Sequence, residues 1–360
     1  MPSIAVRRWP RTADAISKID LFASRLPARM ERDGGAAGWA GADRGWLAVL
    51  AAVTAVTLLW WAAIWMLGIA PVPYLATYVA LAFLALAIAV GLRLALGLRP
   101  SGAPWPAVVA GAILSAVAAS AFLPLKYAIP AEVPFWLDQP IMATERWLFG
   151  TDPWLLLDGL LGWAAVPLDW LYGCWLPVQS VILFSLILAR PSRAKSRALI
   201  AYSLAWFVLG AVAAMLLSSV GPIFYDRLYG GSGFAPLAAT LHARGAWLAI
   251  GESDRMWAAF ASNSPGLVAG ISAAPSIHVA ISLWIYLTAR TVLPRAAPAA
   301  LLYFALIWIG SVQLGWHYAS DGLAGAVGMF GVWQLARLFQ AWPDARRRPP
   351  PELGQPAFLD

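Results

Sequence analysis

Apolar residues in this chain are gathered into long runs that do not alternate with polar residues. Runs of about 17–27 residues are long enough to cross a bilayer core of about 30 Å as helices. Proline and charged residues stand between most of them, and a β-barrel would instead require alternation. The pattern predicts an all-α polytopic membrane bundle of about eight spans, at residues 46–69, 73–92, 105–125, 163–189, 198–219, 277–293, 299–316 and 321–341.

The composition agrees with a membrane protein. Of 360 residues, 61% are hydrophobic and 12% are charged, with a mean hydropathy of +0.69. Soluble domains carry about 25% charged residues. The 21 Trp and 10 Tyr are typical of rings at a lipid–water boundary. An ordinary soluble protein is excluded, and the single cysteine, Cys174, excludes an intramolecular disulfide.

Basic residues indicate which way the predicted spans face. Of the 25 Lys and Arg, 20 lie in alternate connecting segments and the two ends, namely 1–45, 92–103, 190–197, 290–297 and the C-terminal tail. Cytoplasmic loops retain Lys and Arg, so this face is expected to be cytoplasmic. The same rule explains the net charge of +7 without a nucleic-acid partner.

Two segments on the opposite, non-cytoplasmic face are long. Residues 126–162 mix apolar runs with carboxylates, which predicts amphipathic helices at the interface. Residues 220–276 are rich in Gly and Pro, and a loop of this length is usually functional or disordered.

Two of the three histidines are expected at the same membrane surface. His278 opens the sixth predicted span and His317 follows the seventh, so the chain crosses and returns between them. Ser276 can cap the helix that carries His278, and a helix N-terminus favours anions. His317 and Asp321 are four residues apart, so on a helix the carboxylate can orient the imidazole. Each feature alone has an ordinary explanation, as an interfacial histidine or a helix cap, but their convergence indicates a functional site.

Around these residues the sequence resembles a known family. The segments Gly270-Ile-Ser-Ala-Ala-Pro-Ser-Ile-His278 and Gly315-Trp-His317-Tyr-Ala-Ser-Asp321 are similar to the second and third motifs of the type 2 phosphatidic acid phosphatase superfamily. The closer likeness is to its inositolphosphotransferase branch, which includes inositol phosphorylceramide synthase. The motif pair covers about residues 270–325.

The resemblance implies a role for each residue of the two motifs. His317 attacks phosphorus to form a phosphohistidine, Asp321 orients it, and His278 protonates the departing oxygen. Ser276 helps to hold the phosphoryl oxygens. His278, His317 and Asp321 would also suit a metal by ligand type, but this chemistry requires no metal or other cofactor, and we expect none.

Two cationic groups of the phosphatase branch are missing. That branch has a Lys followed after six residues by Arg-Pro, whereas Lys126 is followed at that spacing by Val133 and Pro134, so we interpret the Lys126 match as coincidental. It also carries Ser-Arg before the third-motif histidine, where this chain has Gly310 and Ser311. A monoanionic diester needs less positive charge than a dianionic monoester, so the loss favours a diester donor.

A candidate replacement for one of these cationic groups lies at the end of the fifth predicted span. The stretch that contains Tyr225 and Arg227 is similar to a substrate loop of the transferase branch, and both residues are candidates for substrate binding. The alternative is an ordinary helix end followed by a turn.

The sequence therefore predicts a membrane lipid phosphotransferase that moves a phosphoryl-containing head group, with its site on the periplasmic or exterior face of the cytoplasmic membrane. The substrate partner is a phospholipid or polyprenyl phosphate. A lipid phosphate phosphatase is the alternative, and a transporter is a competitor from another class. We expect a cytoplasmic tail at 1–45, transmembrane helices at 46–125, a catalytic membrane domain at 126–341 and a disordered cytoplasmic tail at 342–360.

Overall fold

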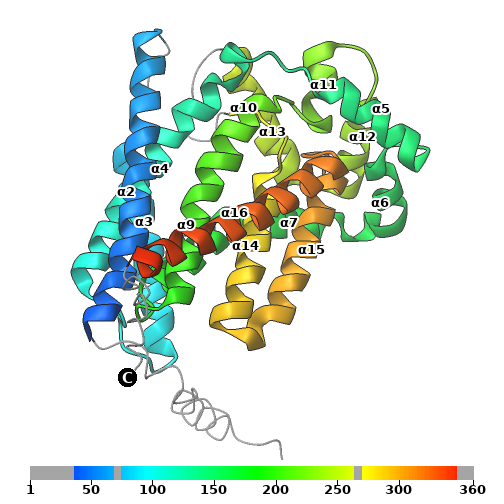
Figure 1. The fold of residues 1–360 in the computed structure, drawn as a ribbon. Helices are drawn as coiled ribbons and strands as arrows, with labels where there is room; N and C mark the ends of the chain where they lie inside the picture. Colours follow the sequence, from blue (N-terminus) through cyan, green and yellow to red (C-terminus); the bar gives the residue numbers. More distant parts are fainter. Residues whose placement is uncertain (1–35, 69–73, 263–269, 347–360) are drawn as a thin grey trace, which may run out of the picture.

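The computed structural model describes residues 36–68, 74–262 and 270–346, and in these ranges every regular element is a helix (Figure 1). This confirms the predicted all-α membrane bundle. The main helices in chain order are α2 (Ala36–Met66), α3 (Leu75–Ala95), α4 (Trp105–Glu132), α5 (Asp138–Phe149), α6 (Pro153–Leu161), α7 (Ala165–Gly173), α8 (Trp175–Ile187), α9 (Arg193–Phe207), α10 (Ala214–Leu216), α11 (Pro222–Tyr229), α12 (Ala235–Arg244), α13 (Trp247–Ala261), α14 (Ile277–Val292), α15 (Ala297–Gln313) and α16 (Ala319–Arg346).

Seven helical stretches of the described chain are long and apolar enough to cross a membrane. These are Asp43–Met66, Leu75–Ala95, Trp105–Glu132, Pro153–Gly173, Arg193–Leu216, Pro294–Gln313 and Ala319–Phe339. Two shorter apolar helices, α8 and α14, accompany them. Six of the seven stretches follow predicted spans, and α14 corresponds to the sixth expected span. The exception is Pro153–Gly173, which overlaps only the first part of the fourth predicted span and begins within residues 126–162, where interfacial helices were expected.

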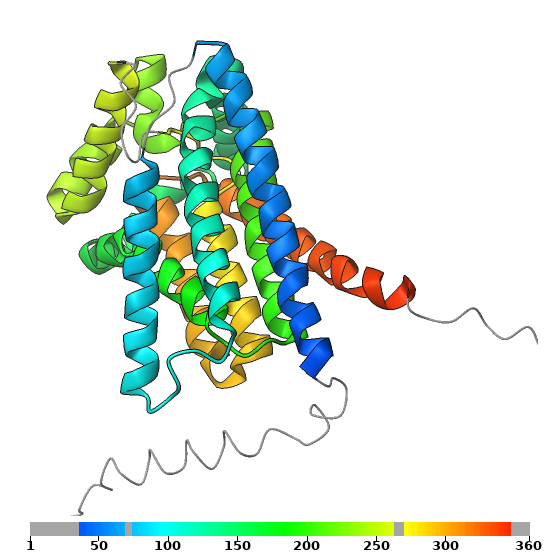
Figure 2. The ribbon, with the colours of Figure 1, turned by 90° about the vertical axis from the view of Figure 1, so that its left-hand side faces the viewer.

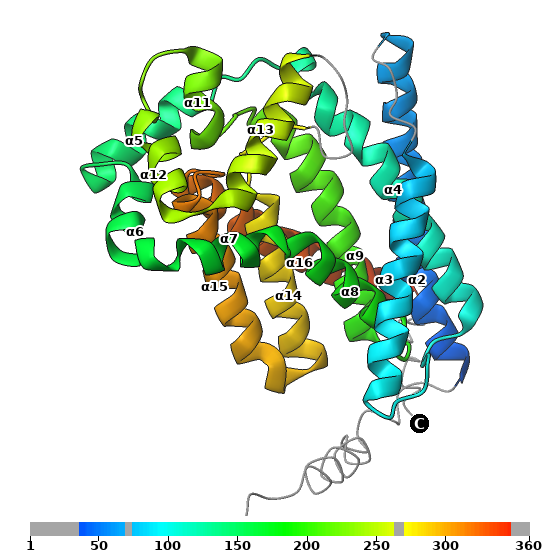
Figure 3. The same ribbon diagram turned by 180° about the vertical axis from the view of Figure 1, so that it is seen from behind.

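The fourth predicted span, residues 163–189, is not one straight helix. It is divided between α7 and α8, and α7 crosses α15 at a steep angle (Figure 3). Pro177, in the first turn of α8, has no N–H to donate to the carbonyl group of Gly173, where α7 ends. Apolar composition alone could not reveal this bend.

The outer segments contain more regular structure than their composition indicated. Residues 126–162 continue α4 to Glu132 and then form the helices α5 and α6, and α6 is the first part of the candidate span Pro153–Gly173 rather than a separate interfacial helix. The predicted long loop at 220–276 instead contains α11, α12 and α13. Prolines in the first turns start α11 and α12, and glycines with positive φ, Gly230 and Gly245, end them.

The ends of the chain differ in part from the expected tails. Helix α16 continues to Arg346, beyond the expected start of the disordered tail at 342. Most of the predicted N-terminal tail (1–35) and the last residues (347–360) lie outside the described residues.

The bundle places its functional elements at one end. Helices α2, α3 and α4 stand together along one side (Figure 2), whereas α14 and α15 form an antiparallel pair that α16 crosses on its way to α9. The outer helices α5, α6, α11, α12 and α13 gather at the end where α14 begins, α15 ends and α16 begins (Figures 1 and 3).

A buried ion pair connects the N-terminal helices to the rest of the bundle. The Lys195 ammonium on α9 lies 3.0 Å from the Asp43 carboxylate on α2, and both side chains are buried. The same carboxylate accepts the indole N–H of Trp46 at 2.8 Å. The Trp46 ring fits against Gly111 of α4, where a Cβ atom would lie 2.6 Å from the ring. This cluster joins α2, α4 and α9.

We expect Asp43→Asn to destabilise the protein strongly. The substitution leaves the Lys195 ammonium buried without a counter-charge, and breaking a buried pair in this way costs about 3–5 kcal/mol. Thermal unfolding in detergent measures the change. The exposed pair Arg227–Asp254 supplies the control, since Asp254→Asn should cost less than about 1 kcal/mol. Equal effects of the two substitutions would contradict this account.

Candidate functional site

The two histidines of the motif segments lie side by side. His278 is the second residue of α14, and His317 lies in the turn between α15 and α16. Their ring centroids are 5.8 Å apart and the ring planes are inclined by 58°. The predicted meeting of the two rings at one end of the bundle is confirmed.

Asp321 is buried behind His317. Its Oδ2 lies 3.6 Å from His317 Nδ1 and accepts the backbone N–H of Tyr318 at 3.0 Å. The distance to the imidazole is longer than a hydrogen bond but within ion-pair range. Such contacts are often long in unliganded sites and tighten when substrate binds. The carboxylate can therefore orient the ring and stabilise a positive charge on it.

Helix α16 rests directly on the start of α14. Ser276 caps α14, with its Oγ accepting the Val279 N–H at 3.4 Å, as the sequence predicted. The Ser276 N–H donates to the backbone carbonyl of Asp321 at 2.9 Å. Gly325 faces the Ser276 carbonyl oxygen so closely that a Cβ atom there would collide with it. These contacts fix the separation of the two histidines.

Aromatic rings enclose His278. The Tyr172 ring stacks on it at 4.5 Å between centroids, and the Trp175 ring lies 4.2 Å away. The Trp175 indole also donates to the His278 carbonyl at 3.2 Å. Among the described residues, His278 Nδ1 is buried without a hydrogen-bond partner. The imidazole is therefore held by packing on its faces.

Lys126 brings a positive charge to this site. Its side chain packs against Gly270, where a Cβ atom would lie 2.7 Å from Lys126 Cγ, and its ammonium interacts electrostatically with His278. Lys126, whose match to the phosphatase branch we interpreted as coincidental, therefore lies beside the segment that leads to His278.

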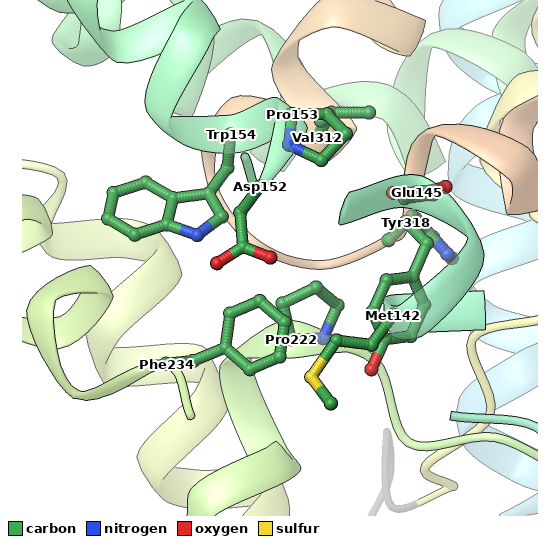
Figure 4. A pocket seen from close by; sticks show the side chains of 10 residues that line it. Met142, Glu145, Asp152, Pro153, Trp154, Pro222, Phe234, Val312 and Tyr318 are labelled. Carbon is green, nitrogen blue, oxygen red and sulfur yellow. The ribbon is translucent and has the colours of Figure 1, made fainter. Parts of the chain in front are cut away.

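A small cavity extends from His317 towards the outer helices. It is lined mainly by residues of α5, α6, α11 and α15, together with Phe234, His317 and Tyr318. Asp152 and Trp154 face Met142 and Tyr318 across it (Figure 4). Asp152 is neutralised by Arg146, whose Nε lies 2.7 Å away.

Two buried carboxylates of α5 lie beside the motif segments. Burial raises the pKa of Glu145, and the hydrogen bonds that it accepts from Ser320 partly offset this rise. Burial also raises the pKa of Asp138, and hydrogen bonds from the backbone N–H groups of Val220 and Gly221 partly offset that rise. No role of either residue could be predicted from the sequence, because nothing in the local pattern indicates what they contact.

The other predicted residues are placed as follows. Arg227 is paired with Asp254 at 2.6 Å, in a partly exposed ion pair. Tyr225 is buried between Tyr229 and Phe234, with ring centroids 4.7 and 5.3 Å away. In the described part of the chain, no interaction joins either residue to the histidines.

A family comparison extends these observations. The model of the PAP2 superfamily matches residues 139–335, more than half of the chain. The chain belongs to the PAP2 superfamily. Members of this superfamily are phosphatases or phosphotransferases, which points to an enzyme acting on lipid phosphates. His278, His317 and Asp321 fall within the matched range, and Lys126 precedes it. No curated protein and no solved structure matched the chain.

The close approach at Gly325 generates a prediction. Gly325→Ala should lower the thermal stability and reduce activity at least about 10-fold, because the new methyl group meets a backbone carbonyl that cannot rotate away. Gly331→Ala on the same helix is the matched control, since nothing lies within 4 Å of a Cβ atom there. Detergent unfolding and turnover measure both, and a Gly325→Ala protein indistinguishable from the control would contradict the argument.

Proposed function

We propose that this chain is an inositolphosphotransferase-like enzyme that moves a phosphoryl-containing head group between lipids at the non-cytoplasmic face of the cytoplasmic membrane. The observation that carries the proposal is the pair of imidazoles 5.8 Å apart, one of them backed by the buried carboxylate of Asp321. This arrangement supplies a nucleophile, an orienting group and an acid around a single phosphorus centre.

The first half-reaction forms a covalent intermediate. Nε2 of His317 attacks phosphorus, and the bond to the donor's leaving oxygen breaks. His278 gives its proton to that oxygen, and Asp321 stabilises the positive charge on His317. A positioned acid contributes about 10²–10⁴-fold to such a step.

The second half-reaction transfers the group to an acceptor. Neutral His278 takes the proton of the acceptor hydroxyl as its oxygen attacks phosphorus, and the bond to His317 breaks. A lipid hydroxyl as acceptor gives transfer, whereas water gives hydrolysis by the same three side chains. Phosphatase action is therefore the alternative outcome of the same mechanism.

The charges around the site support a diester donor. Lys126 and the N-terminus of α14 are placed to attract the non-bridging oxygens, and the Ser276 hydroxyl can donate to one of them while it caps the helix. Gly310 and Ser311 occupy the place of a cationic motif, and the Ser311 hydroxyl donates to the Trp308 carbonyl. A single nearby lysine suits the one negative charge of a diester better than the two of a monoester.

The central test uses purified protein in mixed micelles with phosphatidylinositol as a diester donor or phosphatidic acid as a monoester donor, with and without a lipid hydroxyl acceptor. We expect a new phospholipid from the diester and acceptor. His317→Ala should lower turnover at least about 10³-fold, because the nucleophile is lost. His242→Ala is the matched control, since His242 lies on α12 with its Nδ1 at 2.8 Å from the Ala238 carbonyl. Free phosphate from phosphatidic acid, or free inositol phosphate from phosphatidylinositol, without a new phospholipid would support the phosphatase. Turnover by His317→Ala would refute the mechanism.

Vanadate provides an independent test of the phosphoryl intermediate. Because it mimics pentacoordinate phosphorus, millimolar vanadate should inhibit turnover of either donor. Inhibition should be competitive with the donor, as measured from initial rates. Undiminished activity would count against attack by His317 at phosphorus.

A further inference from the structure

Helix α5 carries two buried carboxylates on one face. Asp138 and Glu145 are seven residues apart, which is two helical turns, and their exposed fractions are 0% and 3%. Burying a carboxylate is costly unless it is well hydrogen-bonded. The partners of these two side chains therefore indicate what α5 does.

Glu145 accepts two hydrogen bonds from Ser320. Its Oε1 lies 2.7 Å from the Ser320 backbone nitrogen and 2.6 Å from Ser320 Oγ. Ser320 is the second residue of α16 and directly precedes Asp321. The first N–H groups of a helix have no acceptor within the helix, and a negative charge near them is favoured by the helix dipole. Glu145 thus caps α16 from a different helix.

The start of α16 needs this external cap. Asp321, the third residue of the helix, reaches back to the Tyr318 N–H as the acid of a capping box does. The reciprocal residue of such a box is Ser or Thr, but the position before Ala319 is held by Tyr318, whose ring cannot cap the helix. Glu145 supplies the missing acceptor.

Asp138 binds the turn at Val220 and Gly221, which lies beside both motif segments. It accepts the N–H groups of Val220 and Gly221 at 2.9 Å each. The adjoining Ser219 accepts the N–H groups of Ala273 and Ala274, in the segment that leads to His278.

The turn that Asp138 holds also contacts the segment that leads to His317. The Ile223 N–H donates to the Gly315 carbonyl at 2.8 Å. Gly221 packs so closely on the Trp316 carbonyl oxygen that a Cβ atom at its positive φ would press on it. Both motif segments therefore contact this one turn.

We propose that Glu145 is a positioning residue that holds the turn carrying His317 and Asp321 in its reactive geometry through Ser320, while Asp138 fixes the other flank. The proposal rests on the proposed function of His317. Glu145 lines the cavity beside His317, but its Oε1 is occupied by Ser320, so its role is to orient the nucleophile and its carboxylate. Small misplacements of reacting groups can lower rates about 10²-fold.

The experiment compares kcat and KM with phosphatidylinositol and phosphatidic acid in mixed micelles. Glu145→Ala should lower kcat about 10–100-fold with KM for the donor unchanged within about twofold. Glu145→Gln should retain most activity, because its amide oxygen accepts both Ser320 donors. Glu132→Ala is the matched control at an exposed position near the end of α4 and should behave as wild type.

Ser320→Ala tests the same contact from the other side. It removes the Oγ donor and keeps the backbone one, so we expect a smaller loss of kcat. Combined with Glu145→Ala it should add nothing further, because both substitutions break one interaction. Ser320→Ala and Glu145→Gln also carry the test if Glu145→Ala fails to fold.

Three outcomes would overturn the assignment. They are wild-type kcat in Glu145→Ala, a raised KM at constant kcat, or a folded Glu145→Gln as inactive as Glu145→Ala. The last would mean that the ionised carboxylate itself takes part in the chemistry. Turnover that survives His317→Ala would instead overturn the proposed function, so the two failures are distinguishable.

Discussion

The close packing of α16 on the first residues of α14 is the constraint on which the site depends. The two histidines belong to different helices, and the hydrogen bond from Ser276 to the Asp321 carbonyl is one of the contacts that set the gap between them. Gly325 allows this contact because it presents no side chain to the Ser276 carbonyl. A helix cap and a glycine therefore determine a distance that the proposed chemistry needs.

Charge is distributed unevenly around that gap. Lys126 and the N-terminus of α14 make the His278 side attractive to anions, whereas Glu145 and Asp138 lie beside the turn that carries His317. Both carboxylates are occupied by N–H or O–H donors of neighbouring segments, which gives each of them a structural role beside the site.

The sequence predicted the features that depend on local pattern. Runs of apolar residues located the membrane helices, and the out-and-back path between His278 and His317 predicted that their rings meet.

Features that depend on distant partners could not be predicted in this way. The bend between α7 and α8, the contact of Lys126 with Gly270 and the cap that Glu145 gives to Ser320 all join residues whose meeting is decided by the whole fold. The helices of residues 220–276 were obscured by a composition rich in glycine and proline, although those residues begin and end helices there.

The stacking of Tyr172 against His278 limits the approaches to the imidazole. Tyr172 covers one ring face and itself stacks on Trp316, while Trp175 lies close on another side. With rings on these sides, the edge of the imidazole is the part that can exchange a proton, so a substrate of the proposed reaction is expected to meet His278 at that edge.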